Sequence, residues 1–257
     1  MTLVNVSLVS YVLKASVRDR LVLSLGILFL IAVSLSLFIG SSAVTETGAA
    51  VLTFAASSAR FIGVISLILF VVFYLRRAFE THDIEYVLSR PVSRVAFINS
   101  HLLAFSLLSL MCVCVIVCGL SLMSSSYINV QGLIFWGISL FFEFMIVAYA
   151  AFFFTMVLPS AVTATMATLA GYALARMIGQ ILGIVDMGSN GRIYDYLGKI
   201  MEASSVIVPR FDLLTQSAWL VYGPDDNVGL IFILLHGSLF LLLIACAAIF
   251  DLLRKEF

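Results

Sequence analysis

The chain has 257 residues, of which 63% are hydrophobic and 11% are charged, and its mean hydropathy is +1.17. Soluble domains contain about 45–50% apolar and about 25% charged residues, so this composition predicts a polytopic membrane protein. The formal net charge is zero. No basic stripe stands outside the membrane flanks, which argues against nucleic-acid binding.

Residues 2–20 predict an amphipathic helix that lies in the membrane interface. One face carries apolar residues at helical spacing: Val6, Val9, Leu13 and Val17. Another face carries polar and basic residues at the same spacing: Ser7, Ser10, Lys14 and Arg18. The basic side suits anionic lipid headgroups. A soluble helix packed on another subunit is the alternative, but direct continuation into an apolar run at Leu21 favours the interfacial position.

Six apolar runs are long enough to cross a bilayer, for which about 20 residues are needed. They are Leu21–Gly40, Val51–Tyr74, Val95–Leu122, Leu133–Leu158, Ala161–Val185 and Val228–Phe250. Pro159 predicts the turn between the fourth and fifth runs, because proline cannot continue a helix and restricts the residue before it. We expect one all-α transmembrane domain over residues 1–257.

The distribution of Lys and Arg predicts the orientation. With the N-terminus inside, the cytoplasmic side collects Lys14, Arg18, Arg20, Arg76, Arg77, Arg90, Arg94, Arg254 and Lys255. The opposite side receives only Arg192, Lys199 and Arg210. Both termini and the segment between the second and third spans are therefore expected to be cytoplasmic.

The longest stretch between spans, Asp186–Asn227, is then external. Within it, Ile193–Met201 and Phe211–Leu220 predict short amphipathic helices separated by Pro209. The mixture of Trp219, aliphatic residues and charge is typical of a helix at the outer interface. Such a stretch could cap the outer mouth of a cavity or could shield the short fifth span.

Three charged residues, Arg60, Glu143 and Arg176, fall inside predicted spans. A charge in hydrocarbon costs at least about 2.5–3.5 kcal/mol, so such residues usually face an interior and find a partner. Counted from the span ends, all three lie in one layer of the outer half of the bilayer. We expect Glu143 to pair with Arg60 or Arg176, which leaves one arginine for a polar cavity or an anionic group. A purely structural ion pair is the alternative.

Cysteine and histidine do not predict a metal or redox site. The cysteines all lie in apolar runs, where small packing residues are expected, although the spacing of Cys114 and Cys118 also permits a soft-metal interpretation. The histidines are dispersed along the chain, and each is expected to be a hydrogen-bonded structural residue: His82, His101 and His236.

The polar segment Arg76–Arg94, between the second and third spans, predicts a short exposed helix. Thr81 can cap its start, and Asp83 and Glu85 supply the negative charge that a helix N-terminus favours. Pro91 ends it. Its apolar residues, flanked by arginines, suit docking in a groove of a soluble partner; they are Phe79, Ile84, Val87 and Leu88. A simple positive-inside loop is the alternative, but it does not explain these apolar residues.

Glu80, Glu85 and the run Val87–Arg94, VLSRPVSR, resemble the coupling segment in the permease subunits of type-2 ABC exporters, the ABC-2 family. The run Pro209–Leu214, PRFDLL, is similar to a segment before the last span in the branch that includes the permease for nitrous-oxide reductase maturation. The family pattern is an interfacial N-terminal helix, six spans with cytoplasmic ends, a coupling helix and external re-entrant helices.

The resemblance implies a dimer of permeases in a bacterial inner membrane, driven by two cytoplasmic ATPase subunits that bind ATP and Mg. It also implies contact of the coupling segment with the ATPase through Phe79, Glu80, Ile84, Glu85, Val87, Leu88, Arg90, Pro91 and Arg94. This chain has no G-x-x-x-x-G-K-[ST] loop, so the ATPase must be a separate polypeptide. We expect no cofactor bound by this chain.

Other functions remain open. No G-x-S-x-G or H-E-x-x-H motif occurs in the sequence, so we expect no catalysis by this chain. A secondary transporter could use the intramembrane charges, although the spans show no inverted repeat. A third possibility is a non-transporting membrane subunit that uses ATPase motion to assemble or move an external protein.

Overall fold

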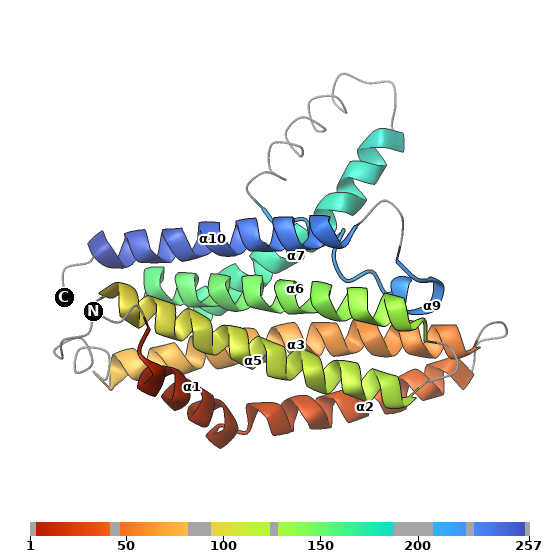
Figure 1. Ribbon diagram of the computed structural model, residues 1–257, viewed down its shortest axis with the longest axis horizontal. Helices are drawn as coiled ribbons and strands as arrows, with labels where there is room; N and C mark the ends of the chain where they lie inside the picture. Colours follow the sequence, from red (N-terminus) through yellow and green to blue (C-terminus); the bar gives the residue numbers. More distant parts are fainter. Residues whose placement is uncertain are drawn as a thin grey trace.

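The computed structural model describes residues 4–41, 47–81, 94–123, 128–187, 208–224 and 229–254. Within these ranges the chain forms eight helices and no strand, as the apolar runs predict (Figure 1). The helices are α1 (Val6–Arg18), α2 (Leu21–Ser41), α3 (Thr47–Glu80), α5 (Arg94–Met123), α6 (Val130–Val157), α7 (Ala161–Met187), α9 (Trp219–Tyr222) and α10 (Leu230–Arg254).

Five of these helices, α3, α5, α6, α7 and α10, are each long and apolar enough to cross a membrane. A sixth span is obtained when α1 and α2 are taken as one helix pair bent by 49°. The six predicted runs thus correspond to observed helices, and the bundle is that of a multi-pass membrane protein. The largest difference is at α3, which continues to Glu80, six residues beyond the predicted end of its span at Tyr74.

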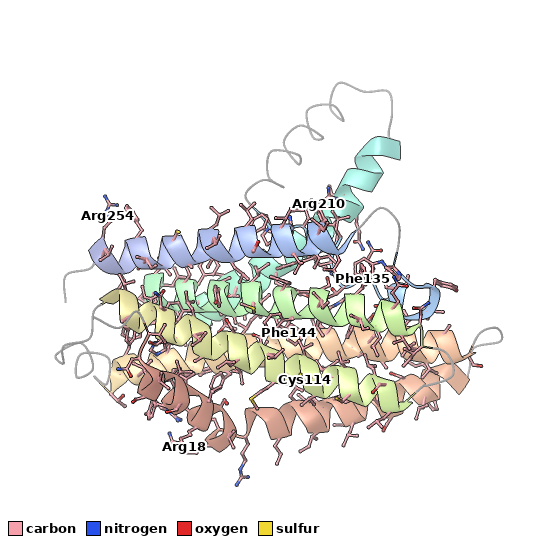
Figure 2. The ribbon with its side chains drawn as sticks, viewed as in Figure 1. Arg18, Cys114, Phe135, Phe144, Arg210 and Arg254 are labelled. Carbon is pink, nitrogen blue, oxygen red and sulfur yellow. The ribbon has the colours of Figure 1, made fainter. Side chains whose placement is uncertain are left out.

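Helix α6 is the centre of the bundle and packs against α3, α5, α7, α9 and α10. Its aromatic side chains Trp136, Phe144 and Phe152 are fully buried (Figure 2 labels Phe144). Lipid tails are as apolar as these side chains, so helices in a membrane associate through close packing, often at small residues. Gly63 of α3 provides such a site, because a Cβ there would overlap the ring of Phe144.

Helices α2 and α10 lie at opposite margins of the bundle (Figure 1). Both expose large apolar side chains along their length. On α2 these include Leu23, Ile27, Leu30, Ile31, Leu35 and Phe38, and on α10 Ile231, Leu235, Leu239, Leu242 and Leu243. In a membrane such surfaces face lipid or another subunit.

The N-terminal helix α1 is present where it was predicted. Asn5 caps it by accepting a hydrogen bond from the backbone N–H of Ser7, at 3.1 Å. The Asn5 backbone N–H donates to Ser100 Oγ at 2.8 Å, which fixes the start of α1 to α5. The helix ends at Arg18, and Arg20 adopts a positive φ of 55° where the chain bends into α2.

The predicted apolar face of α1 is wrong in detail. Val6 and Val17 are 77% and 63% exposed, whereas Val12 and Ser16 are fully buried. The reason is that α1 packs on α5 through the neighbouring face, so Val6 and Val17 point away from the protein. The helix therefore has three faces, one toward the core, one apolar and exposed, and one polar.

The turn at Pro159 is confirmed. Helix α6 ends at Val157, Leu158 takes an extended conformation and α7 begins at Ala161. An extended residue is what a following proline favours.

The start of α1 and the end of α10 lie at one end of the bundle, together with the end of α3 and the start of α5 (Figure 1). We call this the terminal end of the bundle. Helix α9 lies toward the opposite end.

Candidate functional site

Residues 208–224 run into the helical bundle, and we call them the re-entrant segment. At its shallow end, the Asn129 backbone N–H donates to the Leu220 carbonyl at 2.8 Å. Deeper in, the Thr215 backbone N–H donates to Ser139 Oγ at 2.9 Å. Asn129 and Ser139 are separated by about 15 Å along α6, from the 1.5 Å rise per residue. The segment thus reaches well below the ends of the helices around it.

The predicted helix Phe211–Leu220 is wrong. The chain forms turns from Phe211 to Ala218, and only Trp219–Tyr222 is helical, as α9. Phe211, Leu214 and Leu220 are all buried, because α3, α6 and α7 surround the segment. The other predicted external helix, Ile193–Met201, lies outside the described residues.

A non-helical chain inside a membrane protein must have its backbone groups satisfied by neighbours. Here two arginines supply the donors. Arg60 Nη1 of α3 donates to the Thr215 carbonyl at 2.9 Å. Arg176 Nη1 of α7 donates to the carbonyls of Leu214, at 2.9 Å, and of Phe211. Both intramembrane arginines therefore bind the re-entrant backbone.

The carboxylate of Glu143, on α6, is fully buried beside them. Its Oε1 accepts a hydrogen bond from the Tyr172 hydroxyl at 2.8 Å, and its Oε2 accepts one from Thr215 Oγ1. Arg176 Nη1 lies 3.8 Å from Oε2, which makes an ion pair. Of the two pairings that the sequence left open, the structure thus contains the one with Arg176.

The remaining arginine, Arg60, was expected to be left for a polar cavity or an anionic group, but it is not free. Arg60 Nη1 is bonded to Thr215, through the carbonyl and, at 3.4 Å, through the hydroxyl. The three charges lie in one layer, as predicted, because all of them meet at Thr215. We name the group the Thr215 network; its members are Arg60, Ser139, Glu143, Tyr172, Arg176 and Thr215.

Sequence reasoning did not single out Ser139, Tyr172 or Thr215. A signal existed for two of them. Ser139 is four residues before Glu143, and Tyr172 is four before Arg176, so each shares a helix face with a charge. A polar residue at this spacing in an apolar span indicates a buried polar face. Nothing near Thr215 in the sequence identifies it.

The rest of the re-entrant segment is also fixed by side-chain contacts. Arg210 pairs with Asp212 at 2.8 Å, and its backbone N–H donates to Nε2 of His236 at 3.1 Å (Figure 2 labels Arg210). Ser217 shares a 2.9 Å hydrogen bond with Ser57 of α3. These contacts give His236 the structural role that was expected of it.

His101 also has a structural role, since its Nδ1 lies 3.0 Å from the Phe97 carbonyl. The four cysteines are free, with Cys112 buried and the other three exposed. In the described part of the chain no three His, Cys, Asp or Glu residues are grouped in a way that could hold a metal ion.

Most of the predicted coupling segment lies outside the described residues: Ile84, Glu85, Val87, Leu88, Arg90 and Pro91. Its first residues are not a loop, because α3 continues through Glu80. Phe79 packs against the core there, and the Thr81 hydroxyl donates to the Arg77 carbonyl at 2.8 Å. Arg94 is the first residue of α5. The segment is thus short and joins two long helices at the terminal end.

Comparisons of the chain with protein-family models, curated proteins and solved structures find no match. We therefore infer function from the topology, the Thr215 network and the polar segment between α3 and α5.

Proposed function

We propose that this chain is the membrane-spanning subunit of an ATP-driven ABC transporter of the ABC-2 type. The observation that carries the proposal is the run Val87–Arg94, which resembles the coupling segment of that family and belongs to the stretch of chain between the end of α3 and the start of α5. The short apolar helix that the sequence predicts here, flanked by arginines, suits a groove in a soluble partner. The partner would be a cytoplasmic ATPase that binds ATP and Mg.

The proposed complex contains two copies of the permease, or this chain and a homologue, with two ATPase subunits. The Lys and Arg bias supports a cytoplasmic location of the terminal end. The family resemblance supports a bacterial inner membrane. The exposed apolar faces of α2 and α10 provide surface for lipid and for a second permease.

Helix α3 supplies a physical route for coupling. It is one continuous helix of 34 residues that begins at Thr47 and ends at Glu80, next to the proposed coupling segment. Arg60, about 30 Å from Glu80 along the helix axis, binds the re-entrant carbonyl of Thr215. A displacement of the coupling segment by the ATPase would therefore be transmitted along α3 to the re-entrant segment, away from the terminal end of the bundle.

This linkage favours one second candidate, a non-transporting subunit that transmits force to an external protein. Such a subunit needs a rigid connection between ATPase and outer surface but no path for cargo. The bonds from α3, α6 and α7 to Thr215 provide that connection. A secondary transporter gains less support, because Arg60, Glu143 and Arg176 all bind groups of this protein.

Native purification in mild detergent, with mass spectrometry of co-purifying proteins, tests the proposal. We expect an ATPase subunit with the unmodified chain and at least a tenfold lower recovery with Glu85→Ala/Leu88→Ala. The matched control is Arg254→Ala, which removes a charge from the terminal end of α10. Size-exclusion chromatography would verify that each variant remains folded.

Two outcomes contradict the proposal. One is recovery of the unmodified, folded chain with no nucleotide-binding protein. The other is an equal loss of the ATPase from the Arg254→Ala control, which would mean that the effect is not specific to the coupling segment.

A further inference from the structure

A cavity of about 780 Å³ lies at the terminal end, between α1, α2 and α3. It has no part in the Thr215 network, whose residues are absent from its lining. Its mouth is charged and its walls are mostly apolar. The charged residues at the mouth are Arg18, Asp19, Arg76, Arg77 and Glu80.

The mouth has more positive than negative groups. Arg77 lies 3.7 Å from Asp19, but its side chain is 67% exposed, so it can also contact a ligand. Arg76 Nη2 donates to the Thr155 carbonyl at 3.2 Å, while its Nε is buried with no hydrogen-bond partner in the described part of the protein. Arg18, at the end of α1, is exposed and also lines the cavity.

The walls run from this mouth toward the middle of the bundle. Helix α3 contributes Ile62, Ile65, Leu69 and Phe73, and α2 contributes Leu28. Along α3, Ile62 lies about 22 Å from Arg77, from the rise per residue. Half of a hydrocarbon core is about 15 Å thick. The cavity is thus long enough for a headgroup and an acyl chain in one leaflet.

We propose that this cavity binds an anionic phospholipid of the surrounding membrane. The phosphate lies among Arg18, Arg76 and Arg77, and one acyl chain packs along Ile65 and Leu69. Arginine is well suited to this role, since its planar donors match phosphate oxygens. Membrane-facing basic residues also attract anionic headgroups through their charge.

A second copy of the chain is the other occupant that an apolar groove permits. Charge argues against it, because a twofold axis through the groove would bring two basic mouths together. A soluble partner would not match the apolar walls, which extend to the depth of the hydrocarbon core. An anionic lipid satisfies both the basic mouth and these walls.

Native mass spectrometry of the delipidated full chain tests the proposal. Phosphatidylglycerol and phosphatidylcholine with the same acyl chains would be added separately at equal concentration. We expect about tenfold tighter binding of phosphatidylglycerol, which corresponds to about 1.4 kcal/mol. Arg18→Gln/Arg77→Gln should bring its affinity to that of phosphatidylcholine, and Ile65→Trp should weaken both lipids by filling the groove.

Arg254→Gln is the matched control, since Arg254 lies toward the same end but on α10, at the other side of the bundle (Figure 2). It should bind phosphatidylglycerol like the unmodified chain. If the double variant does not fold, Arg77→Gln alone is used, because its largely exposed side chain makes misfolding improbable. It should then weaken phosphatidylglycerol binding several-fold, with phosphatidylcholine unchanged.

Equal binding of the two lipids by the unmodified chain would overturn the proposal. So would an equal loss in Arg254→Gln, which would show only general attraction to charge. A last variant, Leu69→Cys, tests whether a second copy fills the groove. If a disulfide forms between two copies at the same rate with and without phosphatidylglycerol, the occupant is a second copy and not a lipid.

Discussion

The most informative single change in the membrane-embedded part is Glu143→Gln. It removes a fully buried negative charge while it keeps the size of the side chain and one acceptor oxygen. The hydrogen bond from Tyr172, at 2.8 Å, can therefore persist. The ion pair with Arg176, at 3.8 Å, cannot.

Removal of one partner from a buried ion pair costs about 3–5 kcal/mol, because the other charge is left uncompensated. Arg176 would retain its hydrogen bonds to the carbonyls of Phe211 and Leu214. Its side chain is also 24% exposed, so water offsets part of the loss. We therefore expect the free energy of unfolding to fall by about 2–3 kcal/mol, a roughly 30- to 150-fold rise in the opening equilibrium.

Cys112 provides the assay. It is 2% exposed on α5, whereas the other three cysteines are exposed and can be replaced by alanine. A thiol reagent then labels Cys112 only when the bundle opens. Where closing is faster than labelling, the labelling rate follows the opening equilibrium. In the Glu143→Gln variant the labelling rate should therefore rise roughly 30- to 150-fold.

A double-mutant cycle identifies the partner. Glu143→Gln should couple to Arg176→Gln within the range of about 0.5–3 kcal/mol found for residues in contact. It should couple less to Arg60→Gln, since Arg60 reaches Glu143 only through Thr215. The reasoning is refuted if Glu143→Gln accelerates labelling less than about threefold, or if coupling to Arg60 is the larger.

Two further changes test the re-entrant segment with the same assay. Gly132→Ala should destabilise the protein by about 1–3 kcal/mol, because the added Cβ would overlap the Trp219 carbonyl. Gly171→Ala is the control: its Cβ meets no atom, so this change should be neutral or stabilising. Equal effects of the two changes would mean that the segment does not pack on α6. Thr215→Val should lower the free energy of unfolding by about 1–3 kcal/mol, because it removes the hydroxyl that binds Glu143. The control Thr163→Val removes an exposed hydroxyl and should lower it by less than about 0.5 kcal/mol. A Thr215→Val variant as stable as that control would contradict the network.

The long helices could be predicted from the sequence because membrane insertion depends on local composition. Each predicted run is a long apolar stretch that contains at most one charged residue, and each corresponds to a helix. The end of α3 was predicted six residues early because charge at Arg76 and Arg77 marks the membrane boundary and not the end of the helix. Hydropathy detects the bilayer, whereas helix ends depend on capping and packing.

The face of α1 could not be predicted from periodicity alone. Val6, Val9, Leu13 and Val17 form one apolar row, but burial follows contact with α5. In a membrane a valine that faces lipid carries no free-energy penalty, so apolar spacing does not show which side chains face the protein core and which face lipid. Only the partner helix decides which part of a wide apolar face is buried.

The re-entrant segment was mispredicted for a related reason. Its residues from Phe211 to Leu220 are mostly apolar, which fits an interfacial helix and a buried irregular chain equally well. What distinguishes them is the supply of donors for free carbonyls, and these come from Arg60 and Arg176, on helices distant in sequence. Thr215, with a φ of 50°, places its carbonyl and hydroxyl between the two arginines.

The position of the intramembrane charges therefore has a cause that does not depend on a substrate. A chain without helical hydrogen bonds needs donors at the depth where it turns, and arginine supplies several from one side chain. Two such arginines then need a counter-charge, which Glu143 provides. On this reasoning Arg176→Glu cannot rescue Glu143→Arg, although it restores opposite charges, because a carboxylate cannot donate to the carbonyls of the re-entrant segment. A full rescue would show that charge balance alone, and not backbone bonding, selects these residues.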